Sequence, residues 1–423
     1  MAEFRFLHAA DIHLDSPMLG LEADPDAPAQ VLREATRTAL CNLVSLAIAE
    51  KVAFVLIAGD LYDGDWQDYR TGRFFIAQAA RLKDCGIPLV VAAGNHDAAS
   101  IITRHLRLPD GRTLLPHEQC GRVELDEVGV VIHGQSFATR AVTQDLSRNY
   151  PAPAPGLFNI GLLHTALNGR PPHDPYAPTT PETLAAKGYD YWALGHVHAR
   201  EIVHRDPWIV FPGNLQGRRI RESGPKGATL VTVQDGRVME VEHRPLDVLR
   251  WCPIAVSLGG ETGFDGAMMR VGAALSAALR AAEGRPVAAR VRLFGATPLH
   301  GQLLADVERV RQGIIAEGVQ HGTDAVWIES VAIDTASAAA QADLCERPDV
   351  IGRLSAVLDE LIGEAEADPA SAQGTGLLGD YPERLRQRMS GVELAVEHPL
   401  RDGGAELLKR ARDLVLARLA GEA

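Results

Sequence analysis

Five short polar segments constrain the fold of this chain more than any other feature of its sequence. They hold Asp, Asn and His side chains, and each follows an apolar run that predicts a β-strand. In chain order, the segments are Asp11-Ile-His13, Gly59-Asp60-Leu-Tyr-Asp63, Gly94-Asn95-His96-Asp97, Gly161-Leu-Leu-His164 and Gly195-His196-Val-His198. Oxygen and nitrogen ligands of this kind bind hard to borderline divalent metals. Because the segments are far apart in the sequence, only folding can bring them into one site.

The first half of the chain alternates predicted strands with predicted helices, which is the order of a βαβ fold. Strands are expected at Phe4–Ala10, Val52–Ala58 and Ile87–Ala93, and helices at Pro28–Lys51 and Tyr69–Lys83. From Arg122 the pattern is richer in strands and includes a hairpin around Asp235-Gly236. Functional loops in such folds lie at the carboxyl ends of the parallel strands. Residues 1–245 are therefore expected to form two sheets covered by helices.

A domain boundary is expected near Pro245–Arg250, followed by a smaller α/β unit over residues 250–335. Its predicted elements are strands at Trp251–Ser257, Val287–Phe294 and Ala325–Ile333, and helices at Phe264–Ala282 and Leu299–Glu317. Residues 340–423 are expected to form a helical tail, with an apolar stripe from Val350 to Ile362 and an amphipathic helix at Ala405–Leu419. This tail either packs on its own chain or docks on a partner, and the pattern leaves both possibilities open.

Composition narrows the class of protein. The chain has 423 residues, of which 46% are hydrophobic and 23% charged, and these values are typical of a soluble protein of two or three domains. Met1–Asp11 is expected to be a strand and not a signal peptide, and no apolar stretch approaches the ~20 residues of a membrane span. The cysteines are scattered without a Cys-x-x-Cys pair, which favours reduced thiols in a cytoplasmic protein.

One basic cluster stands out in an acidic chain. The net charge of -13 argues against a general nucleic-acid binder, since such proteins are usually basic. The cluster lies between Pro212 and Gly227, shortly after the last polar segment, and holds Arg218, Arg219, Arg221 and Lys226. It is either a solvated loop or a surface that contacts an anionic substrate, and its position after the polar segments makes it a candidate substrate-binding loop.

The polar segments supply enough ligands for two divalent ions. One ion can be held by Asp11, His13 and His198, and the other by Asn95, His164 and His196. Asp60 can bridge the two ions, because a carboxylate has two oxygens and a negative charge. A pair of ions held in this way activates water for attack on phosphorus. Ligation without cysteine suits manganese, iron or similar ions better than a structural zinc site, and the residues do not choose among them.

Three further residues are candidates for direct roles in the reaction. His96 follows the ligand Asn95 and is predicted to face the substrate, as a general acid or as a cation that stabilises the transition state. Asp97 either orients His96 or caps a helix that begins near Ala98. Asp63 is expected to be an outer ligand or a contact of the substrate.

Together the five segments resemble the motif blocks of the calcineurin-like metallophosphoesterase superfamily. The run Phe6-Leu-His-Ala-Ala-Asp-Ile-His-Leu14 and the segment Pro212-Gly-Asn-Leu-Gln-Gly-Arg218 are similar to those of SbcD/YhaO-type DNA repair exonucleases. The resemblance extends from Met1 to about Glu242 with specific motifs. It implies an α/β fold with a two-sheet αββα metallophosphoesterase sandwich, a small α/β capping domain that helps to shape the DNA site, and a helical C-terminal tail.

The resemblance also implies a function. It predicts a metal-dependent nuclease on DNA ends, with Mn²⁺ as the expected metal and Fe²⁺, Mg²⁺ or Zn²⁺ as alternatives. A homodimer and an SbcC-like coiled-coil ATPase, docked on the tail, are the expected partners. Archaeal and eukaryotic members carry His where this chain has Asp63, so the role of that His does not transfer. Two other hypotheses stand beside this one: a small-molecule phosphodiesterase or phosphatase with the same ligands, and a non-catalytic scaffold for an ATPase.

Overall fold

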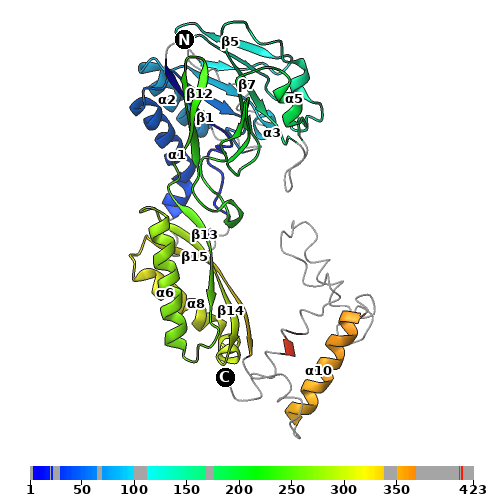
Figure 1. Ribbon diagram of the computed structural model, residues 1–423. Coiled ribbons are helices and arrows are strands. Elements are labelled where there is room, and N and C mark those ends of the chain that lie inside the picture. Colours follow the sequence, from blue (N-terminus) through cyan, green and yellow to red (C-terminus); the bar gives the residue numbers. More distant parts are fainter. Residues whose placement is uncertain are drawn as a thin grey trace. The chain divides into compact units, whose positions relative to one another are not determined.

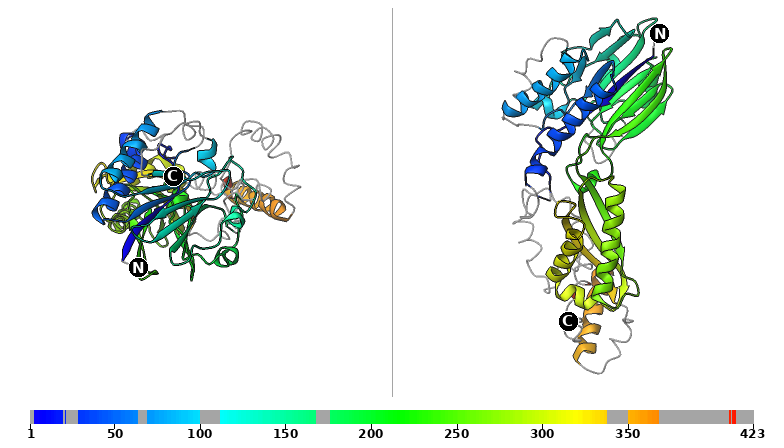
Figure 2. Two further views of the ribbon diagram at one scale, coloured as in Figure 1. Left: turned by 90° about the horizontal axis from the view of Figure 1, so that it is seen from above. Right: turned by 90° about the vertical axis from the view of Figure 1, so that its left-hand side faces the viewer.

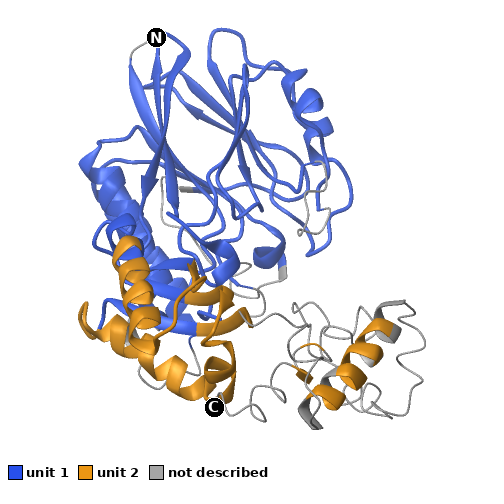
Figure 3. Cartoon of the chain, turned by 60° about the horizontal axis from the view of Figure 1, so that its bottom comes forward, with its two compact units in different colours: residues 1–253, 278–289, 324–329 blue, residues 254–277, 290–323, 330–423 orange. Residues whose placement is uncertain are grey.

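The computed structural model describes residues 3–19, 21, 29–63, 69–99, 112–167, 176–337, 350–367, 409 and 411–412. The chain divides into two compact units (Figure 3). Unit 1 comprises residues 1–253, 278–289 and 324–329, and unit 2 comprises residues 254–277, 290–323 and 330–423. All five polar segments belong to unit 1.

The first sheet of unit 1 has six strands in the order β12-β11-β1-β2-β3-β4 (Figure 1). Its parallel strands are β1 (Phe4–Ala9), β2 (Phe54–Ala58), β3 (Leu89–Ala92) and β4 (Arg112–Leu114). A hairpin of β11 (Gly227–Gln234) and β12 (Arg237–Pro245) pairs antiparallel to β1. The central strands are continuous apolar runs because both of their faces are buried. The predicted βαβ order of the first half is confirmed.

The second sheet has the strand order β5-β6-β7-β8-β10-β9. Its central strands run parallel and are β6 (Val130–Gly134), β7 (Phe158–His164), β8 (Tyr191–Gly195) and β10 (Trp208–Phe211). Its edge strands are β5 (Gly121–Leu125) and β9 (Glu201–Arg205), each antiparallel to its neighbour. The sequence did not predict β4, β5 or β9, and all three lie at sheet edges, where fewer apolar residues are needed.

Hydrophobic cores hold the layers of unit 1 together. Helices α1 (Ala29–Ala49) and α2 (Tyr69–Asp84) cover the outer face of the first sheet, with Leu43 and Phe75 in that core (Figure 2). The two sheets face each other across a core that includes Phe54 and Phe158. Trp192 anchors a further core, between the second sheet, the 3-10 helix η1 (Leu146–Asn149) and α5 (Pro181–Ala185). The predicted two-sheet α/β sandwich is confirmed.

A smaller sheet follows, with the strand order β13-β14-β15. Its strands are β13 (Arg250–Ser257), β14 (Val287–Thr297) and β15 (Val326–Ser337), and the helices between them are α6 (Phe264–Ala281), α7 (His300–Ala305) and α8 (Val307–Val319). The prediction of one helix over Leu299–Glu317 is wrong. Asp306 has a φ of -139°, outside the helical range, and its carboxylate accepts a hydrogen bond from the backbone N–H of Arg309. This N-cap ends α7 and begins α8.

The predicted apolar stripe after residue 349 lies in helix α10 (Val350–Ala367). The predicted helix at Ala405–Leu419 lies outside the described residues, apart from 409 and 411–412. In the described part of the chain, no helix has the length and apolar character that crossing a membrane requires.

Candidate metal centre

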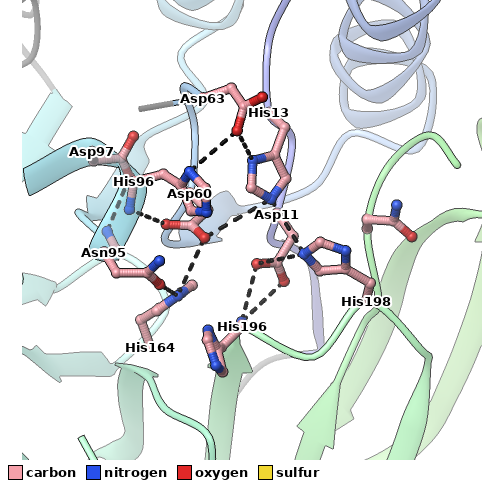
Figure 4. A network of polar contacts seen from close by, with 12 residues as sticks. Asp11, His13, Asp60, Asp63, Asn95, His96, Asp97, His164, His196 and His198 are labelled. Atoms are coloured by element: carbon pink, nitrogen blue, oxygen red, sulfur yellow. Dashed lines mark hydrogen bonds and ion pairs between the residues drawn. The ribbon is translucent and has the colours of Figure 1, made fainter. Parts of the chain in front are cut away.

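The polar segments meet where parallel strands end. Asp11, Asp60 and Asn95 follow β1, β2 and β3, which are neighbours in the first sheet, and Asn95 opens helix α3 (Asn95–Ala99). His164 ends β7 and His196 follows β8, and these strands are neighbours in the second sheet. Figure 4 shows the side chains of all five segments pointing into one space.

The first group of candidate ligands consists of Asp11, His13 and His198, whose ligand atoms all lie within 4.8 Å of one another. The Nε2 atoms of His13 and His198 are only 3.2 Å apart. Nδ1 of His198 lies 2.9 Å from Oε1 of Glu222, and it is the donor because an ionised carboxylate only accepts. The Nε2 lone pair of His198 is therefore directed at the group, as in a carboxylate–histidine–metal arrangement.

The second group consists of Asp60, His164 and His196, again with ligand atoms within 4.8 Å of one another. Nδ1 of His164 donates to the carbonyl of Ala58 at 2.9 Å, and its Nε2 lies 2.9 Å from Oδ1 of Asn95. Oδ2 of Asp60 lies 3.5 Å from Nε2 of His164 and 3.8 Å from Nε2 of His13. One carboxylate oxygen thus lies between the two groups, which is the arrangement that bridging requires (Figure 4).

The electrostatics of these residues fit divalent cations. Burial, and then the charge of Asp60, raise the pKa of Asp11 well above its usual value, and burial also raises the pKa of Asp60. Two buried carboxylates with raised pKa values need positive charge beside them to stay ionised. Burial lowers the pKa of His13, which favours the neutral imidazole that binds metals. The seven predicted ligands are therefore able to hold two divalent ions.

The backbone at the centre is strained. Four candidate ligands have left-handed φ values, namely Asp11 (51°), His13 (45°), Asp60 (51°) and His196 (100°). Each such conformation costs a non-glycine residue on the order of 1–3 kcal/mol, and residues of this kind cluster at functional sites. Two motif glycines allow close approach: a Cβ at Gly195 would lie 1.7 Å from the carbonyl oxygen of Ala58, and one at Gly94 would lie 2.3 Å from Oδ1 of Asp60.

His96 lies at the centre but is oriented by a different carboxylate from the one expected. Its Nδ1 is 3.1 Å from Oδ1 of Asp63, and the same oxygen is 3.3 Å from Nδ1 of His13. Burial lowers the pKa of His96, but the hydrogen bond to Asp63 and the charges of Asp60 and Asp63 outweigh it, so the pKa is raised overall. His96 also forms one group with His13 and Asp60, so the structure brings it close enough to be a ligand.

The structure gives Asp97 a different role from the two that the sequence predicted. Its carboxylate accepts hydrogen bonds from the backbone N–H groups of Leu61, Tyr62 and Gly94, at 3.1, 2.9 and 2.9 Å. It therefore joins the loop after β2 to the loop after β3, and it neither orients His96 nor caps a helix beginning near Ala98. Asp63 takes the orienting role. Its close contacts with His13 and His96 outweigh its burial and hold the pKa of Asp63 below its usual range.

A cavity of about 410 Å³ opens onto the centre. Its wall includes six residues of the polar segments, together with Arg218 and Arg219 of the basic cluster and residues that the sequence did not indicate, among them Arg140 and Tyr176. Arg140 is exposed and has no hydrogen-bond or ion-pair partner among the described residues. No local motif could have found it.

The other two cations of the basic cluster are not on this wall. Lys226 is 8% exposed, and its ammonium donates to the backbone carbonyl of His198 at 2.8 Å, so it supports the last polar segment instead of facing a substrate. Arg221 is exposed and is not among the residues that line the cavity. Glu222, which the sequence indicated only as an opposing charge, is 5% exposed and holds His198.

Comparisons with known proteins agree with this geometry. The profile of the calcineurin-like phosphoesterase family matches residues 4–200, and the profile of the middle domain of metallophosphoesterase YhaO matches residues 251–336. The uncharacterized metallophosphoesterase YhaO of Bacillus subtilis (strain 168) is 33% identical over 303 residues, which cover 70% of this chain and 73% of that protein. This chain belongs to the calcineurin-like metallophosphoesterase family.

Other relatives of this metallophosphoesterase are more distant. The DNA double-strand break repair protein Mre11 of Methanopyrus kandleri is 26% identical over 55% of this chain and 51% of that protein. Mre11 of Sulfurisphaera tokodaii is 26% identical over 59% of this chain and 64% of that protein. Among solved structures, a dimetal phosphatase from Danio rerio matches with a TM-score of 0.34 and 11% identity, over 55% of this chain and 93% of that structure.

Proposed function

We propose that this metallophosphoesterase is a divalent-metal-dependent phosphodiesterase that cleaves DNA, and that Mn²⁺ is its working metal. The observation that carries the proposal is the pair of ligand groups with Asp60 between them and His96 beside them. Two bound divalent ions would supply an activated water molecule and charge stabilisation at phosphorus. The SbcC-like ATPase and the homodimer stay predictions of the resemblance.

The residues of the chain have distinct tasks in this proposal. Asp63 fixes His96 through Nδ1, which leaves Nε2 to hold a proton for the leaving oxygen. The raised pKa of His96 favours the protonated, acidic form of the ring. Arg219 and Arg140 line the cavity with exposed guanidinium groups, which are suited to phosphate oxygens. The kinship to the two Mre11 proteins supports DNA over other phosphoesters.

The proposal is tested with the purified full chain, Mn²⁺ and end-labelled single- and double-stranded DNA. The wild type should cleave DNA, and His96→Ala should bind Mn²⁺ normally but lose ~10²–10⁴ in rate, the usual contribution of a general acid. His117→Ala is the matched control, because that side chain is 55% exposed and lies outside the centre. Loss of Mn²⁺ binding in His96→Ala would make His96 a ligand. Turnover of nucleotides or phosphomonoesters with DNA untouched, with each of Mn²⁺, Fe²⁺, Mg²⁺ and Zn²⁺, would favour the small-molecule alternative.

A further inference from the structure

We propose that Arg218 is a positioning residue that fixes three histidines of the metal centre through two carboxylates, an inference that rests on the function proposed above. The Arg218 side chain is only 13% exposed although it lines the cavity. Most of the side chain is therefore turned toward the protein and is not accessible to a substrate phosphate. This distinguishes it from its neighbour Arg219, whose side chain is 44% exposed.

The guanidinium of Arg218 lies between two carboxylates that do not contact each other. Nη1 is 3.6 Å from Oδ2 of Asp63, and Nη2 is 3.7 Å from Oε1 of Glu222. Nη1 also donates to Oγ of Ser16 at 2.9 Å, and that hydroxyl donates to Oδ2 of Asp63 at 2.7 Å. Arg218 thus holds Asp63 both directly and through Ser16.

The two carboxylates in turn hold the rings of the centre. Oδ1 of Asp63 faces Nδ1 of both His13 and His96, and Oε1 of Glu222 accepts from Nδ1 of His198. A fixed Nδ1 contact sets the orientation of each ring, and with it the direction in which its Nε2 points. One guanidinium therefore sets the orientation of two candidate ligands in the first group, His13 and His198, and of the candidate general acid, His96.

The two sides of this bridge differ in their dependence on Arg218. Glu222 is also fixed by the backbone N–H of Arg218 and by Nδ2 of Asn214, each at 2.8 Å. Among the described residues, Oδ2 of Asp63 has only Ser16 and the guanidinium. Loss of the guanidinium should therefore disturb His13 and His96 more than His198. Arg219 lies 3.3 Å from Glu222 but, in the described part of the chain, makes no contact with Asp63, so it cannot replace this bridge.

The test compares Arg218→Gln, Arg218→Lys and Arg219→Gln in the full chain. Mn²⁺ affinity is measured by calorimetry without DNA, and kcat and KM are measured on DNA at saturating Mn²⁺. Arg218→Gln should lower Mn²⁺ affinity by about 10–100-fold, as the loss of outer contacts of metal-bound histidines does, and should also lower kcat. Arg218→Lys should restore neither the Mn²⁺ affinity nor kcat, because one compact ammonium cannot contact both carboxylates. Arg219→Gln should raise KM and leave Mn²⁺ affinity unchanged.

A raised KM with wild-type Mn²⁺ affinity and kcat in Arg218→Gln would overturn the inference and make Arg218 a substrate contact. Thermal unfolding of the metal-free variants shows whether each one folds. If Arg218→Gln does not fold, the Mn²⁺ affinity and kcat of Arg218→Lys are used to test the inference. The proposed function fails separately, if the wild type binds no Mn²⁺ or cleaves no DNA. The Mn²⁺ titration needs no nuclease activity, so the two failures are distinguishable.

Discussion

At the scale of single residues, Asp60 is the group on which the two halves of the centre depend. Its Oδ1 accepts from the backbone N–H of His96 at 3.0 Å, while Oδ2 lies between Nε2 of His13 and Nε2 of His164. One carboxylate therefore serves both ligand groups and the loop that carries His96. The sequence indicated this role because a carboxylate has two oxygens and a negative charge, and the structure adds that Asp60 follows β2, the middle of three neighbouring strands.

Asp60→Asn should weaken both Mn²⁺ sites together, because the substitution removes the charge that lies between them. Each affinity should fall by at least about tenfold, since even the loss of outer contacts costs 10–100-fold. Calorimetric titration of the full chain measures both sites, and Asp126→Asn, at an exposed carboxylate, is the control. Loss of one site with the other intact would refute bridging by Asp60.

His8 makes the fold sensitive to acid without belonging to the centre. Its Nδ1 lies 3.0 Å from the hydroxyl of Tyr191 and its Nε2 lies 3.0 Å from the carbonyl of Leu194, and burial lowers the pKa of this ring to about 3. The folded-state pKa is below the unfolded value of 6.5, so the neutral ring stabilises the fold fully above pH 6.5. That contribution is lost as the pH falls from 6.5 toward 3.

Urea unfolding of the metal-free chain at pH 8 and pH 5 tests this sensitivity. His8 should account for a loss of about 2 kcal/mol in the free energy of unfolding at pH 5, from 1.36 kcal/mol for each pH unit below 6.5. The pH dependence of His8→Gln should be weaker than that of the wild type by this amount. His117→Gln, at an exposed ring, should keep the wild-type dependence. An unchanged dependence in His8→Gln would show that other groups cause the acid loss.

At the scale of elements, the sequence predicts well where the central strands end. It predicts poorly the edge strands and the local contacts between loops. Long apolar runs mark the buried central strands, and the ligands that follow them converge because parallel strands end at one edge of a sheet. The edge strands β4, β5 and β9 have no such run. The break at Asp306 and the pairing of Asp63 with His96 depend on the local path of the chain, which hydrophobic periodicity does not encode.

Gly195 is a single residue on which the contact between two elements depends, since it ends β8 where the second sheet touches the first. Gly195→Ala should disrupt the centre and cost ~1–3 kcal/mol or more, because its Cβ would overlap the backbone oxygen of Ala58, which no rotamer change can relieve. The readouts are thermal unfolding and Mn²⁺ affinity. Gly363→Ala is the control, because nothing lies within 4 Å of a Cβ at that site in α10. Wild-type stability and Mn²⁺ affinity in Gly195→Ala would contradict this account of the contact between the sheets.

At the scale of the whole molecule, the charge of the chain and the charge of the cavity have opposite signs. The net charge is -13, yet exposed guanidinium groups of Arg140 and Arg219 line the cavity. Arg140 belongs to the loop after β6 in the second sheet and Arg219 to the loop after β10, so the fold gathers them and the sequence does not. DNA binding by the chain alone should therefore depend on a small number of local contacts.

The affinity for DNA should therefore depend only weakly on salt concentration. Each neutralised phosphate contributes about -0.9 to the slope of log K against log salt concentration, so two cavity arginines give a slope of about -1.8. Fluorescence anisotropy with duplex DNA and the His96→Ala protein, which cleaves slowly, measures the slope. A second change, Arg140→Gln, should reduce it by about 0.9, the share of one phosphate contact. Arg122→Gln should not, because that side chain pairs with Glu124 on β5, outside the cavity. A steep slope that Arg140→Gln leaves intact would place DNA on another surface of the chain, since the number of phosphates contacted would then exceed what this cavity offers.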